Sequence, residues 1–142
     1  MFFHIDPTNG LAIYEQVARQ VVFAVAGGAL APCEMVPSVR ELARELAVNP
    51  NTVARAYREL QARGVLEPVR GTGLAVTQGA VAKCREDRLR MIRARLQQVL
   101  VEAKQSRLDH QQLQALVQAE MAAINSEEGR VGQAQRSPTS GD

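Results

Sequence analysis

The sequence is poor in aromatic residues and in cysteine, and both shortages limit what the protein can be. Phe, Tyr and Trp make up 4% of the 142 residues and Trp is absent, so a core must be built from aliphatic side chains. The two cysteines, Cys33 and Cys84, lie far apart, without C-x-x-C spacing or a His/Cys cluster. We therefore expect two free thiols in a reducing compartment, with no disulfide framework, no metal site and no cofactor.

Long apolar runs are also missing. The first ten residues contain His4, Asp6 and Pro7 and do not resemble a secretory signal, and no stretch is long enough to span a bilayer. We expect a cytoplasmic, nucleoid-associated protein with no membrane partner.

A catalytic constellation is not apparent either. His4 and His110 have no neighbouring Cys, Ser or paired carboxylate in the sequence that would support acid–base or nucleophilic chemistry. An enzyme is therefore the least favoured class.

What the sequence does contain is a pair of closely spaced short helices after a first helix over residues 11–26. The first of the pair begins at Ser38, where Ser38 and Glu41 form a capping box. The second begins three or four residues after the first ends, with Asn49 as N-cap and Pro50 at the first helical position. Helices joined this tightly indicate a helix-turn-helix.

Two short strands are predicted directly after this pair, over residues 65–69 and 74–77, with a turn over 70–73. A hairpin in this position is typical of a wing. The predicted fold class is therefore α+β, mostly α: a winged helix-turn-helix over residues 1–77, followed by a two-helix dimerisation tail.

That tail is expected over residues 78–124. In its first helix, over residues 80–106, apolar side chains alternate spacings of three and four, which is typical of a helix seam. Asp109 and Gln112 form a capping box for the second helix. We expect the dimer contacts to come from Leu89, Ile92, Leu96, Val99, Leu113 and Val117. From Asn125 to Asp142, Gly, Ser, Pro and charge predominate, and we expect disorder.

The second short helix carries the candidate recognition surface. With Val53, Ala56, Tyr57 and Leu60 directed inward, polar side chains remain outside that suit base edges and phosphates in double-stranded DNA. With supporting residues before the helix and at the hairpin tip, the candidate DNA contacts are Ser38, Arg40, Asn49, Asn51, Thr52, Arg55, Arg58, Arg70 and Gly71. Without the preceding helix and the following hairpin, an ordinary solvated face would be the favoured interpretation of these side chains.

Charge is distributed unevenly. Residues 83–107 carry eight basic and three acidic side chains, whereas both ends of the chain are acidic. The arginines of the seam helix could touch flanking phosphate, line a dimer interface or simply face water, and the sequence does not separate these alternatives.

Several segments in order and spacing resemble the GntR family of bacterial transcription factors: residues 37–43, 46–53, 56–60, 64–66 and 71–73. The resemblance spans residues 11–77, and the short helical tail is similar to that of the YtrA subfamily. It implies a DNA-binding homodimer, often a repressor. It further implies that Arg40 lies near the DNA backbone, Asn51 and Thr52 in the recognition helix, and Arg70 and Gly71 at the wing tip.

Three positions depart from the family pattern. Pro50 stands where many members carry a base-reading Arg, Ala75 replaces a wing aromatic, and Cys33 stands where a turn Gly is common. The operator of this protein therefore does not follow from its relatives.

The predicted function is sequence-specific DNA binding in transcription regulation, by a homodimer on a roughly palindromic operator. The alternative is a winged helix that serves as a protein–protein adaptor. A small-molecule effector is compatible with both, and the sequence identifies none.

Overall fold

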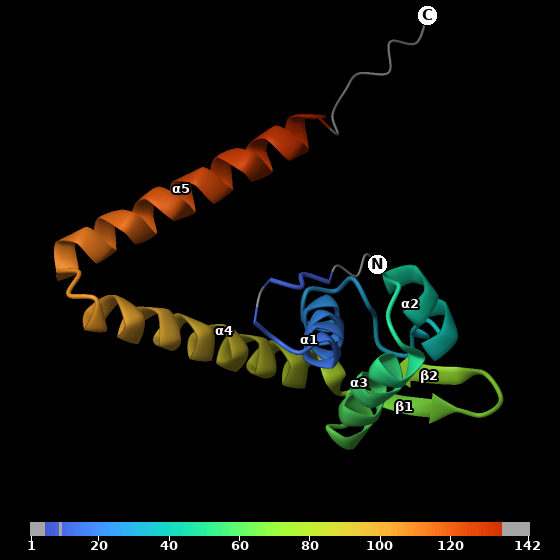
Figure 1. Cartoon of the computed structure of the whole chain (residues 1–142). Coiled ribbons are helices and arrows are strands. Elements are labelled where there is room, and N and C mark those ends of the chain that lie inside the picture. The colour runs from blue at the N-terminus through green and yellow to red at the C-terminus, as the bar shows by residue number, and fades with distance from the viewer. Residues whose placement is uncertain (1–4, 9, 135–142) are drawn as a thin grey trace, which may run out of the picture. The chain divides into compact units, whose positions relative to one another are not determined.

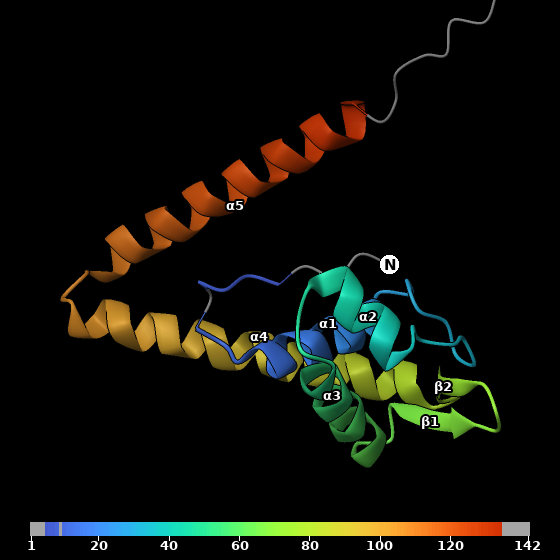
Figure 2. The same cartoon turned by 45° about the vertical axis from the view of Figure 1, so that its right-hand side comes forward.

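The computed structural model describes residues 5–8 and 10–134, and the contacts divide the chain into two units, Met1–Ala94 and Arg95–Asp142. The described part contains five helices and two strands (Figures 1 and 2). In order they are α1 (Ile13–Ala26), α2 (Val39–Leu46), α3 (Pro50–Ala62), β1 (Leu66–Val69), β2 (Gly73–Val76), α4 (Ala80–Gln105) and α5 (His110–Ala134). No helix among residues 5–8 and 10–134 combines the length and hydropathy that crossing a bilayer requires.

The core of the N-terminal unit is aliphatic, as its composition requires. The fully buried side chains include Val17, Val21, Val22 and Val25 of α1, Leu42 of α2, and Val53 and Leu60 of α3. Tyr57 is the large aromatic exception at 2% exposed, and its hydroxyl donates a 2.8 Å hydrogen bond to the Pro37 carbonyl. The three helices therefore enclose one core without Trp or Phe at its centre.

Local capping fixes where α2 and α3 begin. The Ser38 hydroxyl accepts the Glu41 N–H at 3.1 Å, and Oδ1 of Asn49 accepts the Asn51 N–H at 2.8 Å. Between them the chain turns at Ala47, which adopts a left-handed conformation with φ of 54°. The predicted helix-turn-helix is confirmed, with both N-caps at the predicted residues.

The hairpin after α3 is also confirmed, with β1 and β2 antiparallel from Leu66 opposite Val76 to Val69 opposite Gly73. The loop that the sequence predicts over residues 29–37 is present, and it makes backbone contacts that the sequence did not indicate. Residues 33–36 pair with the other edge of β2: the Cys33 N–H donates to the Val76 carbonyl at 2.8 Å, and the Val36 N–H donates to the Leu74 carbonyl at 3.0 Å. Cys33 enters this segment with φ of 69°, a conformation that glycine adopts more easily.

The first turns of α4 pack on the core of the N-terminal unit. Ala80 and Cys84, one helical turn apart, are fully buried, and Nε of Arg85 donates to the Ala26 carbonyl at 3.3 Å. The unit consequently continues past Thr77 to Ala94.

The C-terminal unit contains the rest of α4 and the whole of α5. Their connection turns at Arg107 (φ 61°), and Asp109 and Gln112 form the predicted reciprocal capping box at 2.8 and 3.1 Å. α5 continues to Ala134, which corrects the prediction of disorder for residues 125–134; the rest of that predicted tail, 135–142, lies outside the described residues. Glu127, Glu128 and Ala134 are good helix formers and outweigh Gly129 and Gly132.

We expect the two thiols to differ sharply in reactivity. Cys33 is exposed, whereas Cys84 is fully buried, and burial, with the nearby Asp87 carboxylate, raises the pKa of the Cys84 thiol. In the native protein at pH 8, a colorimetric disulfide reagent should titrate one thiol per chain rapidly and the second only after denaturation. Cys33→Ser should remove the fast phase. Rapid reaction of two thiols per native chain would contradict the buried position of Cys84.

Candidate nucleic-acid interface

The two sides of α3 differ completely in exposure. Val53, Ala56, Tyr57 and Leu60 are buried, as predicted, and hold the helix in the core. On the opposite side Asn51, Arg55 and Arg58 are exposed, while Thr52 is half-buried. The structure therefore presents a polar, cationic helix face to solvent, supported from behind by tight packing.

At the beginning of α3 the predicted residues serve different purposes. Oδ1 of Asn49 is engaged with the Asn51 N–H, so this side chain caps the helix. The Asn51 side chain is exposed in the first turn, where the helix dipole also favours an anion. Among the predicted contacts in this turn, Asn51 is the side chain best placed to reach a base edge.

Arg55 is exposed but not isolated. Its guanidinium carbon lies 3.8 Å from the centroid of the Tyr14 ring, which comes from α1. This geometry is that of a cation–π contact, and it orients the guanidinium over the first turns of α1. This contact joins residues 41 positions apart and therefore has no local signal in the sequence.

The predicted residues before α3 also differ in role: one caps a helix and the other is exposed. The Ser38 hydroxyl caps α2, whereas Arg40, in the first turn of α2, is exposed. Burial raises the pKa of Tyr57, whose hydroxyl fastens α3 to the backbone just before α2. The first turn of α2 is thus held against the recognition helix, with the Arg40 side chain on the surface.

The hairpin turn carries the last two predicted residues. Arg70 is exposed, and Gly71 has φ of +76° with no atom within 4 Å of where a Cβ would lie. The backbone conformation, and not a close neighbour, is what requires glycine at Gly71. The tip is therefore a tight, cationic turn.

The arginines of α4 are not all alike. Arg85 binds the Ala26 carbonyl, and Arg90 binds Asp87 at 2.5 Å. Arg88 is half-buried, whereas Arg93 and Arg95 are exposed. For Arg85 and Arg90 the structure thus shows intramolecular bonds, which the sequence alone did not suggest.

The predicted dimer contacts are largely solvent-accessible in the single chain. Leu89 (59%), Leu96 (51%) and Val99 (57%) are more than half exposed, Ile92 and Val117 somewhat less, and Leu113 is half-buried. Within the C-terminal unit, a groove of about 760 Å³ runs along Leu100, Lys104, Leu108, His110, Leu113 and Val117. Among residues 5–8 and 10–134, no group of His, Cys, Asp and Glu is arranged to hold a metal ion.

The chain is similar to a known protein family and to known sequences. The model of the family described as "Bacterial regulatory proteins, gntR family" matches residues 13–76. The HTH-type transcriptional repressor YtrA of Bacillus subtilis is 38% identical over 99 residues, which are 70% of this chain and 76% of YtrA. The HTH-type transcriptional regulator Rv1152 of Mycobacterium tuberculosis is 42% identical over 66 residues, 46% of this chain and about half (54%) of Rv1152.

Solved structures with the same fold support this relationship. A GntR family transcriptional regulator from Listeria monocytogenes has a TM-score of 0.64 at 26% identity, covering 81% of this chain and 98% of its own. YtrA from Sulfolobus acidocaldarius has a TM-score of 0.53 at 31% identity, covering 71% of this chain and 99% of its own. Together with the winged helix and its exposed α3 face, these similarities establish that the chain belongs to the GntR family of bacterial regulatory proteins, as a DNA-binding transcriptional regulator related to YtrA.

Proposed function

We propose that the protein is a homodimeric repressor that binds a roughly palindromic operator with one α3 helix in each of two successive major grooves. The observation that carries the proposal is the two-sidedness of α3, with four buried side chains behind and exposed Asn51, Arg55 and Arg58 in front. A helix so supported enters a groove without disturbing the core. Such a protein acts where the chromosome is, at the nucleoid in the cytoplasm.

Base recognition is assigned to the first turns of α3. Asn forms two hydrogen bonds with the major-groove edge of adenine, and Arg forms two with guanine. Asn51 and Arg55 lie one helical turn apart on the exposed side, so both reach the same short stretch of bases. Thr52 and Arg58 flank them and suit a phosphate or a neighbouring base.

Backbone contacts are assigned to the two cationic positions outside α3. Arg40 lies in the first turn of α2, the helix that crosses the DNA backbone in helix-turn-helix proteins. Arg70 lies in the tight hairpin turn beside Gly71, and a narrow minor groove attracts an arginine there. Such contacts fix the orientation of the protein and carry little sequence information.

The helical region over residues 78–124 is assigned to dimerisation. Its Leu, Ile and Val side chains are exposed in the single chain, and exposed apolar side chains gathered on one region mark a surface that a partner covers. A two-fold dimer presents two identical recognition helices about one turn of DNA apart, which requires an operator with two related half-sites. Repression is inferred from the related Bacillus protein, which is named a transcriptional repressor.

Selection of binding sites from random double-stranded DNA tests the proposal as a whole. The expected product is a pair of inverted half-sites bound at nanomolar protein. Binding that shows no enrichment of any sequence would contradict operator recognition, and would leave the protein-adaptor alternative in its place.

The two kinds of DNA contact should be separable by mutation. Asn51→Ala should cost about 1–3 kcal/mol of binding free energy at particular base pairs, because it removes a paired contact to a base edge. Arg40→Ala should weaken binding to all sequences alike and reduce the salt slope by about one. Fluorescence anisotropy on an operator series at several salt concentrations measures both effects, with Lys104→Ala as the charge-matched control. Asn51→Ala protein that ranks all operator variants as wild type does would contradict its role.

Tyr14 should support Arg55 through its ring. Tyr14→Leu should weaken operator binding about two- to fivefold, because an exposed cation–π contact contributes about 0.5–1 kcal/mol. Tyr14→Phe keeps the ring and should bind as wild type does. Equal affinity of the Leu and Phe variants, with unchanged thermal unfolding, would show that the contact does not prepare Arg55 for DNA.

Dimerisation should depend on the apolar seam of α4. Leu96→Glu should convert the dimer to monomer, because it places a charge among side chains that are buried only in the dimer. Gln98→Glu adds the same charge two residues away, on a different face of α4, and should leave the dimer intact. Sedimentation equilibrium distinguishes the two species. A Leu96→Glu protein that remains dimeric would place the interface elsewhere.

A further inference from the structure

One carboxylate lies on the side of α4 that faces the core. Ala80, Cys84, Asp87 and Met91 follow one another at spacings of four, three and four, and Asp87 is only 4% exposed. A buried carboxylate is costly unless charged partners surround it. Because Asp87 lies on an otherwise apolar stripe, its carboxylate requires positively charged partners placed close to it.

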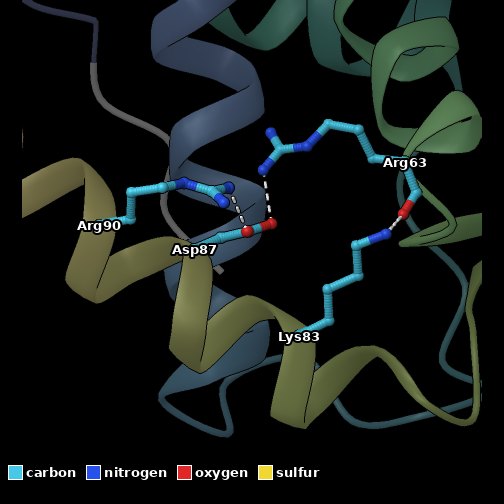
Figure 3. Close-up of polar contacts among 4 residues, drawn as sticks. All are labelled: Arg63, Lys83, Asp87 and Arg90. Carbon is cyan, nitrogen blue, oxygen red and sulfur yellow. Dashed lines mark hydrogen bonds and ion pairs between the residues drawn. The ribbon is translucent and has the colours of Figure 1, made fainter.

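Two guanidinium groups supply that arrangement. Arg63 donates to Oδ2 of Asp87 and Arg90 donates to Oδ1, both at 2.5 Å (Figure 3). In addition, Nζ of Lys83 donates to the main-chain carbonyl of Arg63. Figure 3 shows Lys83, Asp87 and Arg90 on α4 and Arg63 opposite them, so Arg63 is bound to α4 through its side chain and its backbone.

The two arginines have different consequences for the fold. Arg90 lies three residues after Asp87 on the same helix, and its side chain is 71% exposed, so this bond stays within α4. Arg63 is the C-cap of α3, and its side chain is 26% exposed. The Arg63–Asp87 pair therefore connects the end of the recognition helix to α4. The Arg90–Asp87 pair lies within α4 and joins it to no other element.

We propose that Asp87 is a positioning residue which, through Arg63, sets the recognition helix relative to the dimerisation helix and so determines the half-site spacing that the dimer accepts. The inference rests on the proposed homodimer. Leu89 and Ile92, the first two seam residues, lie two and five residues after Asp87 and belong to the same unit as α3. In a two-fold dimer joined along that seam, the separation of the two α3 helices depends on how each α3 is held against its own α4.

Stability alone does not account for the pair. Ala80 and Cys84 already bury the first turns of α4, and buried ion pairs seldom stabilise a fold more than apolar side chains of the same size. What an ion pair with two fixed oxygens provides is direction, since guanidinium and carboxylate bind in restricted geometries. The pair therefore specifies an orientation that apolar packing leaves loose.

The test measures binding to operators whose half-sites are moved together or apart by one and two base pairs, and to a single half-site. The operators come from the binding-site selection described above. Wild type should bind best at one spacing and lose at least tenfold at the others. Asp87→Asn and Arg63→Gln should each lose about tenfold at the best spacing, flatten the spacing profile, and bind the single half-site as wild type does.

Two further variants control for charge and for folding. Arg90→Gln removes one positive charge from the same cluster but leaves the Arg63–Asp87 bond, and it should keep the wild-type spacing profile. Arg63→Lys keeps the charge opposite Asp87 and should restore part of the spacing preference; it also serves if Asp87→Asn does not fold. The double variant Asp87→Asn/Arg63→Gln should be no worse than either single variant, because both remove the same bond.

The outcomes separate this inference from the function on which it rests. A wild-type protein without a preferred half-site spacing overturns the proposed dimeric recognition and this inference together. A wild type with a preferred spacing that Asp87→Asn and Arg63→Gln both retain overturns the positioning role alone. Equal loss at every spacing and on the single half-site assigns the pair to stability of the winged helix, and likewise overturns it.

Discussion

The burial of one side of α3 is the constraint on which the molecule depends. Val53, Ala56, Tyr57 and Leu60 are almost completely removed from water, and the helices α1 and α2 pack against them. Because an α-helix has 3.6 residues per turn, burying that stripe leaves Asn51, Arg55 and Arg58 outside. Packing and recognition thus use opposite sides of one helix, and an error in the core would displace the recognition side chains.

A chain with few aromatic residues builds this constraint from valine and leucine. Valine is short and, being β-branched, stiff at χ1, so the buried valines fix the helices at close range, and leucine fills the remaining volume. Polar contacts then fix orientations that aliphatic packing, which is not directional, leaves less restricted. The Tyr57 hydroxyl fastens α3 at Pro37, the Tyr14 ring holds Arg55, and Asp87 holds Arg63.

Features with a local cause were accessible from the sequence. Ser38, Asn49 and Pro50 predict where α2 and α3 begin, because a cap involves residues two or three positions apart. The helical spacing of the apolar residues predicts the buried side of α3. Contacts between distant segments have no such signal. The Tyr14–Arg55 and Arg63–Asp87 pairs, and the pairing of residues 33–36 with β2, join residues 24 to 43 positions apart. Composition also misled at residues 125–134, where helix formers continue α5 despite Gly129 and Gly132.

The additional pairing at residues 33–36 also decides which side of the small sheet remains open. One edge of β2 is covered by that segment and the other by β1, so β1 is the outer strand. Glu67 and Pro68 occupy its middle, and both are exposed. Proline has no N–H to offer to an incoming strand, and a carboxylate repels close stacking of identical copies. The hairpin is thereby protected from edge-to-edge aggregation, a hazard for any protein that exposes a two-stranded ribbon at its surface.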